Sequence, residues 1–389
     1  MKLRFACLVA LILIVSPLVL RSGTHDYGIA NNDLDGPNTA TIGEYLDGAL
    51  MHVSTVRTGG HGSGVGNNSN TASNRVVIVP NGSAQCAFLS DAGTSDIAAF
   101  TLSGSHIVRV GNYSNTNFEG GNAIALAAHG SVLFAGYYGS ANIGSWAIQS
   151  DCSLVLLNLT SLMHFATVNG MGVTPDGQIL IVSYGNSSID SFSIGTAGSL
   201  IEHGPYTPVH GDSTIQGLDI TAESKAVIFA SIDNDTKLDI WEYGIQTDGS
   251  LGSYTDYAEL TPNVDYCVYP RLSPNEQFIY VSCGVDAHEH NVVTLSFDRS
   301  SGTIAYVSTT NLSPQYNAFT SAGQLATISP NGNGDGLYVT LTNPTMSSVA
   351  LLTINADGTT VETPNSPFFI TKYGGPGLSS IAAWPPRPF

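Results

Sequence analysis

The sequence predicts an all-β fold, a seven-bladed β-propeller of four-stranded antiparallel blades, and three recurring features predict it. A short turn such as Asp248-Gly249-Ser250-Leu251 occurs seven times, at intervals of about 50 residues. Before most copies an apolar residue is followed three positions later by an aromatic residue or leucine, as at Ile189 and Phe192. Earlier in several units, a turn containing proline precedes a β-rich run. Units of this length pack radially around a central axis.

The turn copies share a small second residue, because a tight hairpin needs a permissive backbone. They begin at Asp47, Ser103, Asp151, Ala197, Asp248, Ser301 and Asp357. The proline turns at 174–177, 273–276 and 329–332 precede runs rich in Val, Ile, Tyr and Phe, which are typical of strands. The three features together divide each unit into four strands. A pair of β-sandwiches is the alternative, but it does not explain why the three features recur in register.

The two ends of the chain predict how the ring closes. Six continuous blades begin near Val76, Asn122, Asn169, Gln216, Val268 and Gln324. We expect the seventh to be a composite blade, built from residues 24–57 and the strand 378–384. Pairing the N- and C-terminal strands in this way covers two sheet edges that would otherwise be exposed. Residues 23–389 are therefore predicted to form a single propeller domain.

Residues 1–22 are predicted to be a secretory signal peptide. Lys2 and Arg4 precede an apolar run from Phe5 to Leu20, which contains Ser16 and Pro17. This run is too short and too interrupted for a spanning helix, which needs about 20 apolar residues. We expect an extracellular protein with no membrane span, released or held at a cell wall.

The charge balance restricts the partners. The chain has 12 Lys and Arg against 30 Asp and Glu, giving a net charge of −18. Three of these cations lie in the predicted signal peptide. Nucleic acid and anionic membranes are recognised through many Lys and Arg side chains, so both are excluded as partners. We expect a monomer that binds a small carboxylated molecule, a glycan or a protein.

Four cysteines remain after the predicted signal peptide, and an even number in an exported chain indicates two disulfides. Sequence alone allows three pairings. The strand positions favour Cys86–Cys152, between neighbouring blades, and Cys267–Cys283, across one hairpin. Seven N-x-S/T sequons predict a glycoprotein. They lie at Asn67, Asn81, Asn112, Asn158, Asn186, Asn234 and Asn311.

The predicted inner strands line a central channel, where side chains of several blades converge. Amide side chains recur where these strands begin, and we expect them to bind a ligand or to hold channel water and unpaired carbonyl groups. These amides are Asn122, Asn169, Gln216 and Gln324. Tyr137, Tyr138 and Tyr184 follow second strands and are predicted to reach the same rim, with Tyr137 and Tyr184 as the candidate ligand-binding residues that stack on a ring or a sugar. The tryptophans fall on strand positions that suit packing instead.

Arg271 is the main candidate for binding a carboxylate, because a guanidinium can bind both carboxylate oxygens. Asp219 on the neighbouring inner strand is its expected companion, as a ligand-binding residue or as an ion-pair partner. His164 and His210 lie in loops that enter inner strands and are candidate proton carriers. Asp286, His288 and His290 alternate in one loop, but we expect no metal and no cofactor.

The proline turn followed by Phe278-Ile279-Tyr280-Val281-Ser282, with the later D-G-S-L turn, resembles the seven-bladed lactonase family. That family includes fungal 3-carboxy-cis,cis-muconate cyclases and bacterial 6-phosphogluconolactonases. The exported, glycosylated form looks like cyclase-like surface glycoproteins of filamentous fungi. The resemblance covers nearly all of the mature chain. It implies an anionic substrate held by Arg and His at the channel mouth.

Two functions remain open from the sequence. The first is a secreted cycloisomerase or lactonase for a small carboxylated substrate, with Arg271 as the anchor and His164 or His210 moving the proton. The second is a catalytically inactive extracellular protein, like an adhesin or antigen, that binds a partner through the propeller rim. Acidity and export favour the second function, whereas the family resemblance favours the first.

Overall fold

The computed structural model describes residues 26–387 with interruptions. The gaps are 35, 47–48, 64–73, 83, 104–105, 115–121, 139, 163–167, 186–187, 205–213, 225, 233–237, 257–264, 286–288, 302, 313–327, 343–346 and 370–379. The predicted signal peptide lies outside the described residues. Within them, no helix has the length and apolar character that crossing a membrane requires.

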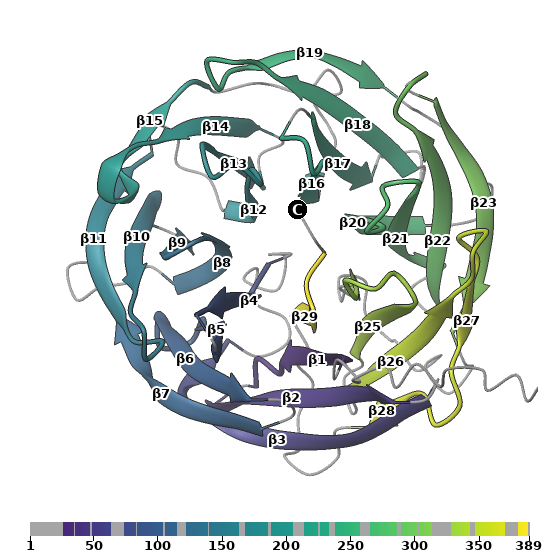
Figure 1. The fold of residues 1–389 in the computed structure, drawn as a ribbon, viewed down its shortest axis with the longest axis horizontal. Coiled ribbons are helices and arrows are strands. Elements are labelled where there is room, and N and C mark those ends of the chain that lie inside the picture. The colour runs from purple at the N-terminus through teal and green to yellow at the C-terminus, as the bar shows by residue number, and fades with distance from the viewer. Residues whose placement is uncertain are drawn as a thin grey trace, which may run out of the picture.

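The described strands form antiparallel sheets arranged radially around a central axis (Figure 1). The composite sheet contains β29 (Ser380–Trp384), β1 (Asp26–Asn31), β2 (Gly36–Leu46) and β3 (Ala49–Gly62). The next contains β4 (Val76–Asn81), β5 (Ala84–Asp91), β6 (Asp96–Ser103) and β7 (His106–Ser114). It is followed by β8 (Asn122–His129), β9 (Val132–Tyr138), β10 (Asn142–Ile148) and β11 (Leu154–Ser161).

The chain continues around the ring in the same pattern. One sheet contains β12 (Val168–Val173), β13 (Ile179–Tyr184), β14 (Ile189–Ile194) and β15 (Leu200–Glu202), with the short 3-10 helix η2 (Thr196–Gly198) before β15. The next contains β16 (Thr214–Ile220), β17 (Ala226–Ile232), β18 (Leu238–Ile245) and β19 (Leu251–Asp256). Then come β20 (Asp265–Leu272), β21 (Phe278–Val285), β22 (Glu289–Asp298) and β23 (Thr303–Asn311).

The last sheet departs from the predicted pattern of seven four-stranded blades. Six sheets have four strands, whereas β24 (Ile328–Pro330), β25 (Gly336–Thr342), β26 (Ser347–Ile354) and β27 (Thr360–Glu362) are joined by a fifth strand, β28 (Phe368–Phe369). The cause is the shortness of β27, which pairs only with residues 352–354 of β26. The other end of β26 is left with open backbone groups, and β28 pairs with residues 348–349 there. The described ring therefore has six four-stranded blades and one five-stranded sheet.

The predicted pairing of the N- and C-terminal strands is present. β29 is antiparallel to β1, in a register that runs from Asn31 opposite Ser380 to Tyr27 opposite Trp384. The rings of Tyr27 and Trp384 stack, with centroids 6.5 Å apart. Asp26 also binds across the junction, because its Oδ2 accepts hydrogen bonds from the amides of Asn331 (3.0 Å) and Asn333 (2.7 Å). Backbone pairing and side-chain contacts thus close the ring together.

Both predicted disulfides are present. Cys86 of β5 is bonded to Cys152 in the turn between β10 and β11, which joins two neighbouring sheets. Cys267 of β20 is bonded to Cys283 of β21 within one sheet. The Cys86–Cys152 bond is buried in a core cluster that also contains Phe88, Leu133 and Trp146. Clusters of this kind fill the spaces between neighbouring sheets and fix their relative positions.

A buried polar cluster joins the composite sheet to the sheet that begins with β4. Arg75 and Asp33 are both almost fully buried and form a two-pronged ion pair, with contacts of 2.6 and 2.7 Å. Close by, the Asn38 amide donates to Asp91 Oδ1 at 2.6 Å. The Asn112 amide donates to both Asp91 Oδ2 (3.1 Å) and Asp96 Oδ1 (3.0 Å). Burial, and to a lesser extent the nearby Asp96 carboxylate, raise the pKa of Asp91 to about 7.

Stability is predicted to depend on the disulfide that spans the longer loop. The two bonds close segments of 66 and 16 residues. Chain entropy alone then assigns a stabilisation of about 4 and about 3 kcal/mol respectively. We expect Cys86→Ala/Cys152→Ala to lower the free energy of unfolding more than Cys267→Ala/Cys283→Ala, by about 1 kcal/mol. Guanidinium denaturation of the two variants measures this, and the reverse order would contradict it.

The Asp91 carboxyl is predicted to make stability fall as pH rises. Its pKa in the folded protein is about 7, against an ordinary value of 3.8, so folding favours its protonated form. This contribution is fully present below pH 4 and is lost between pH 4 and 7, by at most a few kcal/mol. Asp96→Asn removes the neighbouring charge while keeping an oxygen for Asn112. NMR titration should then show a lower Asp91 pKa, and an unchanged value would contradict the assignment.

Candidate functional site

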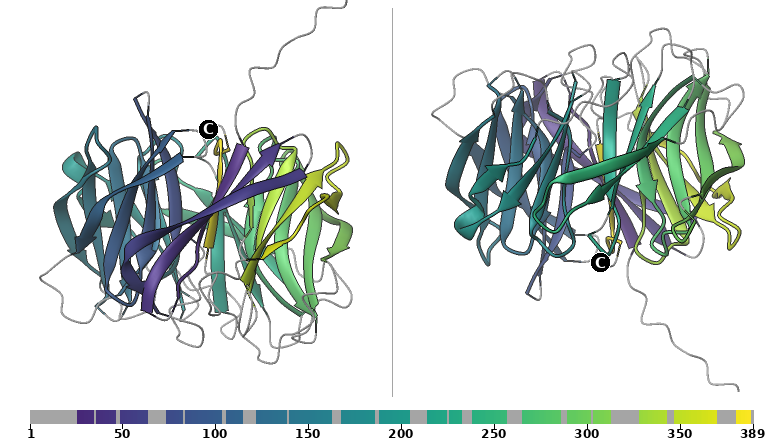
Figure 2. Two further views of the ribbon diagram at one scale, coloured as in Figure 1. Left: turned by 90° about the horizontal axis from the view of Figure 1, so that it is seen from below. Right: turned by 90° about the horizontal axis from the view of Figure 1, so that it is seen from above.

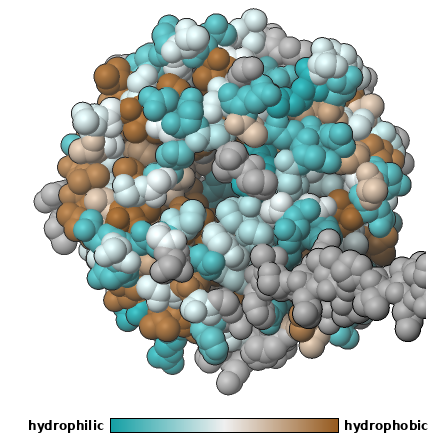
Figure 3. All heavy atoms as spheres, in the orientation of Figure 1, coloured by the Kyte–Doolittle hydropathy of each residue, from teal (hydrophilic) through white to brown (hydrophobic). Residues whose placement is uncertain are grey.

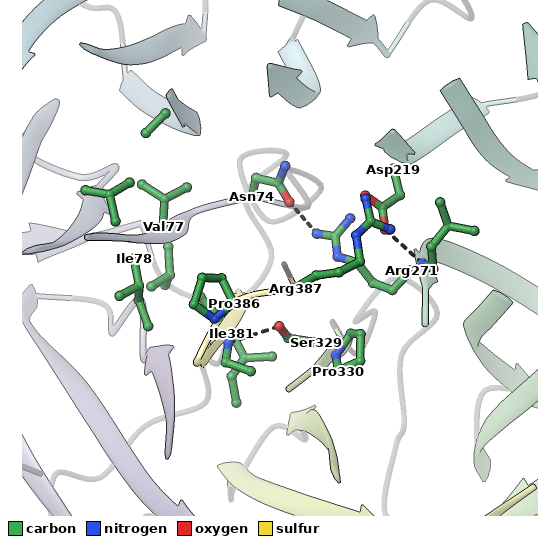
Figure 4. Close-up of a pocket in the computed structure, with 16 residues that line it drawn as sticks. Asn74, Val77, Ile78, Asp219, Arg271, Ser329, Pro330, Ile381, Pro386 and Arg387 are labelled. Carbon is green, nitrogen blue, oxygen red and sulfur yellow. Dashed lines mark hydrogen bonds and ion pairs between the residues drawn. The ribbon is translucent and has the colours of Figure 1, made fainter. Parts of the chain in front are cut away.

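A cavity of about 220 Å³ lies at the centre of the ring, among the innermost strands (Figure 4). Most of its lining residues come from β4, β16, β20, β24 and β29, or from the segments next to them. Figure 3 shows the hollow at the ring centre bordered by hydrophilic residues on the viewed face. This is the channel that the sequence predicts, and its charged side chains are Asp219, Arg271 and Arg387.

Arg271 lies in the channel, as predicted, on strand β20. Its Nη1 donates to the backbone carbonyl of Leu218 at 2.8 Å and to that of Pro270 at 3.3 Å. Its Nη2 donates to Oδ1 of Asn74, which reaches into the cavity from just before β4. Burial lowers the pKa of Arg271, and the Asp219 carboxylate opposes that effect. The guanidinium stays charged under all ordinary conditions, because an arginine begins with so high a pKa.

Asp219 lies beside Arg271, on strand β16. Its Oδ1 accepts the backbone N–H of Ile220 at 2.9 Å, and its Oδ2 accepts the backbone N–H of Leu272 at 2.8 Å. Its ion-pair partner in the described structure is Arg387, with Nη1–Oδ2 and Nη2–Oδ1 distances of 3.2 and 3.3 Å. The sequence prediction paired Asp219 with Arg271 or left it for a ligand, and it did not include Arg387.

Arg387 and Asn74 are two cavity residues that bond to the predicted site residues but were not predicted from the sequence. Arg387 lies three residues after the end of β29, the strand that runs along the ring axis (Figure 2). Its side chain is 7% exposed, and its Nη2 also donates to the carbonyl of Ile220. Asn74 precedes β4 and donates to the carbonyl of Met171 at 2.5 Å. Both residues lie outside the repeated turns, so the repeat pattern contains no signal for them.

The predicted ring of amides is described only in part. Asn169 is 2% exposed and donates to the carbonyl of Ile215 at 2.9 Å, which links β12 to β16. Asn122 and Gln216 lie in β8 and β16, but their side chains are outside the described structure. Gln324 is outside it altogether. The one amide whose side chain is described therefore fits the second of the two predicted roles, because it bonds to a backbone carbonyl on the neighbouring inner strand.

The two candidate proton carriers, His164 and His210, lie outside the described residues. The same holds for Asp286 and His288 of the alternating loop. Of the histidines that are described, His203 lies beyond β15, with its Nε2 2.7 Å from Ser193 Oγ and away from the residues that line the cavity. No group of three or more potential metal ligands occurs in the described part of the chain.

Two of the three tyrosines expected at the rim are in the core instead, and the side chain of Tyr138 is outside the described structure. Tyr137 is 2% exposed and packs with Phe88 and Trp146. Tyr184 is fully buried, and burial, followed by the Asp190 carboxylate, raises its pKa. Each lies at the end of a second strand, where successive side chains alternate between faces. The sequence could not tell which face is covered by the neighbouring sheet, so the prediction for Tyr137 and Tyr184 is wrong.

Four of the seven predicted glycosylation sites are described. The amides of Asn81 and Asn158 donate to the carbonyls of Gln149 (2.8 Å) and Ala197 (2.6 Å), and that of Asn112 bridges two carboxylates as above. Asn311 is exposed at the end of β23. Asn67, Asn186 and Asn234 lie outside the described residues.

Asn112 is predicted to carry no glycan, because a substituent on Nδ2 would break its bonds to Asp91 and Asp96. Asn112→Gln should lower the free energy of unfolding by about 1–3 kcal/mol, since it removes the hydrogen bonds to the buried Asp91 carboxyl and to the partly buried Asp96 carboxylate. The matched variant Asn311→Gln should change it by less than about 0.5 kcal/mol. Glycopeptide mapping and thermal denaturation test this, and a glycan found on Asn112 would refute it.

Comparison with known proteins shows similarity at the level of the fold. No family model matches the chain, and no curated protein matches it. A Bacteroides fragilis protein provisionally named 6-phosphogluconolactonase is 12% identical with a TM-score of 0.67, over 93% of this chain and 99% of its own. A similarly named protein of Bacteroides uniformis is 10% identical with a TM-score of 0.65, over 92% and 99%. The periplasmic gluconolactonase PpgL of Pseudomonas aeruginosa is 13% identical with a TM-score of 0.64, over 91% and 97%.

Proposed function

We propose that this protein is an exported lactonase or cycloisomerase that acts on a small carboxylated molecule in the central channel. The observation that carries the proposal is the charge of the cavity. The whole chain has a net charge of −18, yet the described residues that line the cavity include two guanidinium groups and one carboxylate. An acidic protein that concentrates positive charge at its centre has a site suited to an anion.

Arg271 is the proposed anchor for the substrate carboxylate. In the described structure its hydrogen-bond acceptors are neutral oxygens, those of Leu218, Pro270 and Asn74. Neutral acceptors satisfy hydrogen bonds but do not cancel the charge of a partly buried cation such as Arg271. A carboxylate entering the cavity would supply the missing negative charge through a charge-assisted, two-pronged contact.

Lactone opening needs a group that takes a proton from water as its oxygen bonds to the ring carbonyl carbon. The ring C–O bond then breaks, and the released alkoxide takes up a proton, leaving a hydroxy acid. His164 and His210 are the proposed proton carriers, because imidazole exchanges protons near neutral pH. In a cycloisomerase reaction, a carboxylate oxygen of the substrate instead adds to one carbon of a C=C bond and closes the lactone ring, while the adjacent carbon of that bond takes up a proton from the proton carrier.

The structural similarities support a lactonase over other enzymes, since gluconolactonase and 6-phosphogluconolactonase names occur among propellers of similar shape. Two disulfides suit an oxidising compartment. The finer proposal is a secreted, glycosylated fungal protein similar to 3-carboxymuconate cyclases, and it rests on the predicted signal peptide, the sequons and the sequence resemblance.

Arg271→Gln is predicted to lower kcat/KM for lactone hydrolysis by at least 100-fold, because it removes the carboxylate anchor. The assay follows acid release by the purified protein with carboxymuconolactone, which bears free carboxylates, and the loss is expected for this substrate; glucono-1,5-lactone and 6-phosphogluconolactone, which bear none, are comparison substrates. Arg57→Gln, the same change on the exposed face of β3, is the matched control and should leave the rate unchanged. Equal rates for the two variants would remove Arg271 from the mechanism.

One observation favours a second function, that of a binding protein without catalysis. Arg271 and Asp219 already have partners within the chain, and Arg387 reaches across the cavity to pair with Asp219. A site with its groups engaged in this way suits a decayed active centre. Under this alternative, none of the three lactones is turned over, and a glycan array or surface-protein panel retains a ligand.

A further inference from the structure

Asp219 and Arg271 are placed so that they could form an ion pair with each other. They lie on the neighbouring inner strands β16 and β20, and each side chain bonds to the backbone of the other strand. Arg271 Nη1 donates to the carbonyl of Leu218, directly before Asp219. Asp219 Oδ2 accepts the N–H of Leu272, directly after Arg271. Without another partner for Asp219, its carboxylate would be available to neutralise the Arg271 guanidinium from the neighbouring strand.

The ion-pair partner of Asp219 is Arg387 instead. Its two terminal nitrogens contact the two carboxylate oxygens, at 3.2 and 3.3 Å, while two backbone N–H groups bind the same oxygens. The carboxylate therefore has four donors. In Figure 4 the Arg387 side chain extends across the cavity from the segment after β29 to Asp219, and the Arg271 side chain is turned toward Asn74.

The segment that carries Arg387 is held firmly in place. The N–H of Gly332 donates to the carbonyl of Pro385 at 2.7 Å. A Cβ atom at residue 332 would lie only 2.3 Å from the carbonyl oxygen of Pro386, so only glycine allows this close approach. Gly332 thus contacts the backbone at Pro385 and Pro386, directly before Arg387, and the Arg387 side chain reaches Asp219 from this position.

We propose that Arg387 is a positioning residue: by neutralising Asp219 it prevents an Asp219–Arg271 ion pair and leaves the Arg271 charge available for a ligand with a single carboxylate. The inference rests on the proposed function and specifies its substrate class. Two guanidinium groups and one carboxylate leave an excess of one positive charge among the described lining residues. One carboxylate balances that charge, whereas a sugar acid that also bears a phosphate would bring negative charges without a described partner.

The test is equilibrium binding of D-gluconate by calorimetry, with the neutral D-glucitol as the ligand control. The unaltered protein should bind gluconate and should bind 6-phosphogluconate at least 10-fold more weakly. Arg387→Gln should weaken gluconate binding at least 10-fold, because Asp219 is then free to pair with Arg271. Arg57→Gln, on the exposed face of β3, should have no effect.

The decisive variant is the double change Asp219→Asn/Arg387→Gln. It removes the competing carboxylate together with the arginine, so gluconate affinity should return to within about threefold of the unaltered protein. If the double variant binds as weakly as Arg387→Gln, then Arg387 contacts the ligand itself and the positioning role is wrong. Unchanged binding by Arg387→Gln would overturn the proposal equally.

Two further readouts keep the result unambiguous. Circular dichroism and thermal denaturation show whether each variant is folded. If Arg387→Gln does not fold, Arg387→Lys replaces it; this variant keeps the positive charge and should bind gluconate with an affinity within about threefold of the unaltered protein. Lactone turnover is measured separately. Intact binding with the rescue pattern but no turnover would defeat the lactonase proposal and leave the role of Arg387 standing. Absence of gluconate binding by the unaltered protein would overturn the role of Arg387.

Discussion

The antiparallel pairing of β29 with β1 is the constraint on which the rest of the structure depends. It joins the two ends of the described chain in one sheet, so that no strand edge remains between the first and last blades. It also decides where the chain goes next. Because β29 is the innermost strand of its sheet, the residues after Trp384 enter the central channel and place Arg387 opposite Asp219 (Figure 1). The closure of the fold and the charge of the site are therefore one arrangement.

The described arginines at the centre of the ring are used in different ways. Arg75 is fully neutralised by Asp33 and ties the composite sheet to its neighbour. Arg387 is neutralised by Asp219 and braces the channel. Arg271 is bonded only to uncharged oxygens among the described residues. Burying a charge without a counter-charge costs stability, and such costs are commonly found where a protein binds or transforms a ligand.

The sequence predicted the repeating architecture because the signals for it are local. A hairpin turn needs its small residue regardless of what lies around it, so Gly249 or Gly358, both with positive φ, reveal a strand boundary directly. The disulfides followed once the strands were placed, since Cys86 and Cys152 then fall at the same edge of neighbouring blades. The fifth strand β28 was missed because a two-residue strand has no pattern of its own.

The site was predicted less completely, because it depends on contacts between distant parts of the chain. Arg271 was found because it stands at an aligned position of an inner strand. Arg387 and Asn74 were missed because they lie in connecting segments and reach their partners across the channel, Asn74 being 197 residues from Arg271. Tyr137 and Tyr184 were misplaced because strand alternation alone does not show which face the neighbouring sheet covers. Long-range packing, which no local pattern encodes, decides all four cases.

Native-state hydrogen exchange across the closing strands tests the account most directly. If β29 closes the ring, the backbone amide of Ala382, which lies opposite Ile29, should exchange only through global unfolding, at the same rate as those of 28–30 in β1. Exchange of the Ala382 amide at least 100-fold faster than residues 28–30 would show that β29 opens independently of the sheet. In that case the channel would lack a fixed Arg387, and the proposed charge arrangement would not hold.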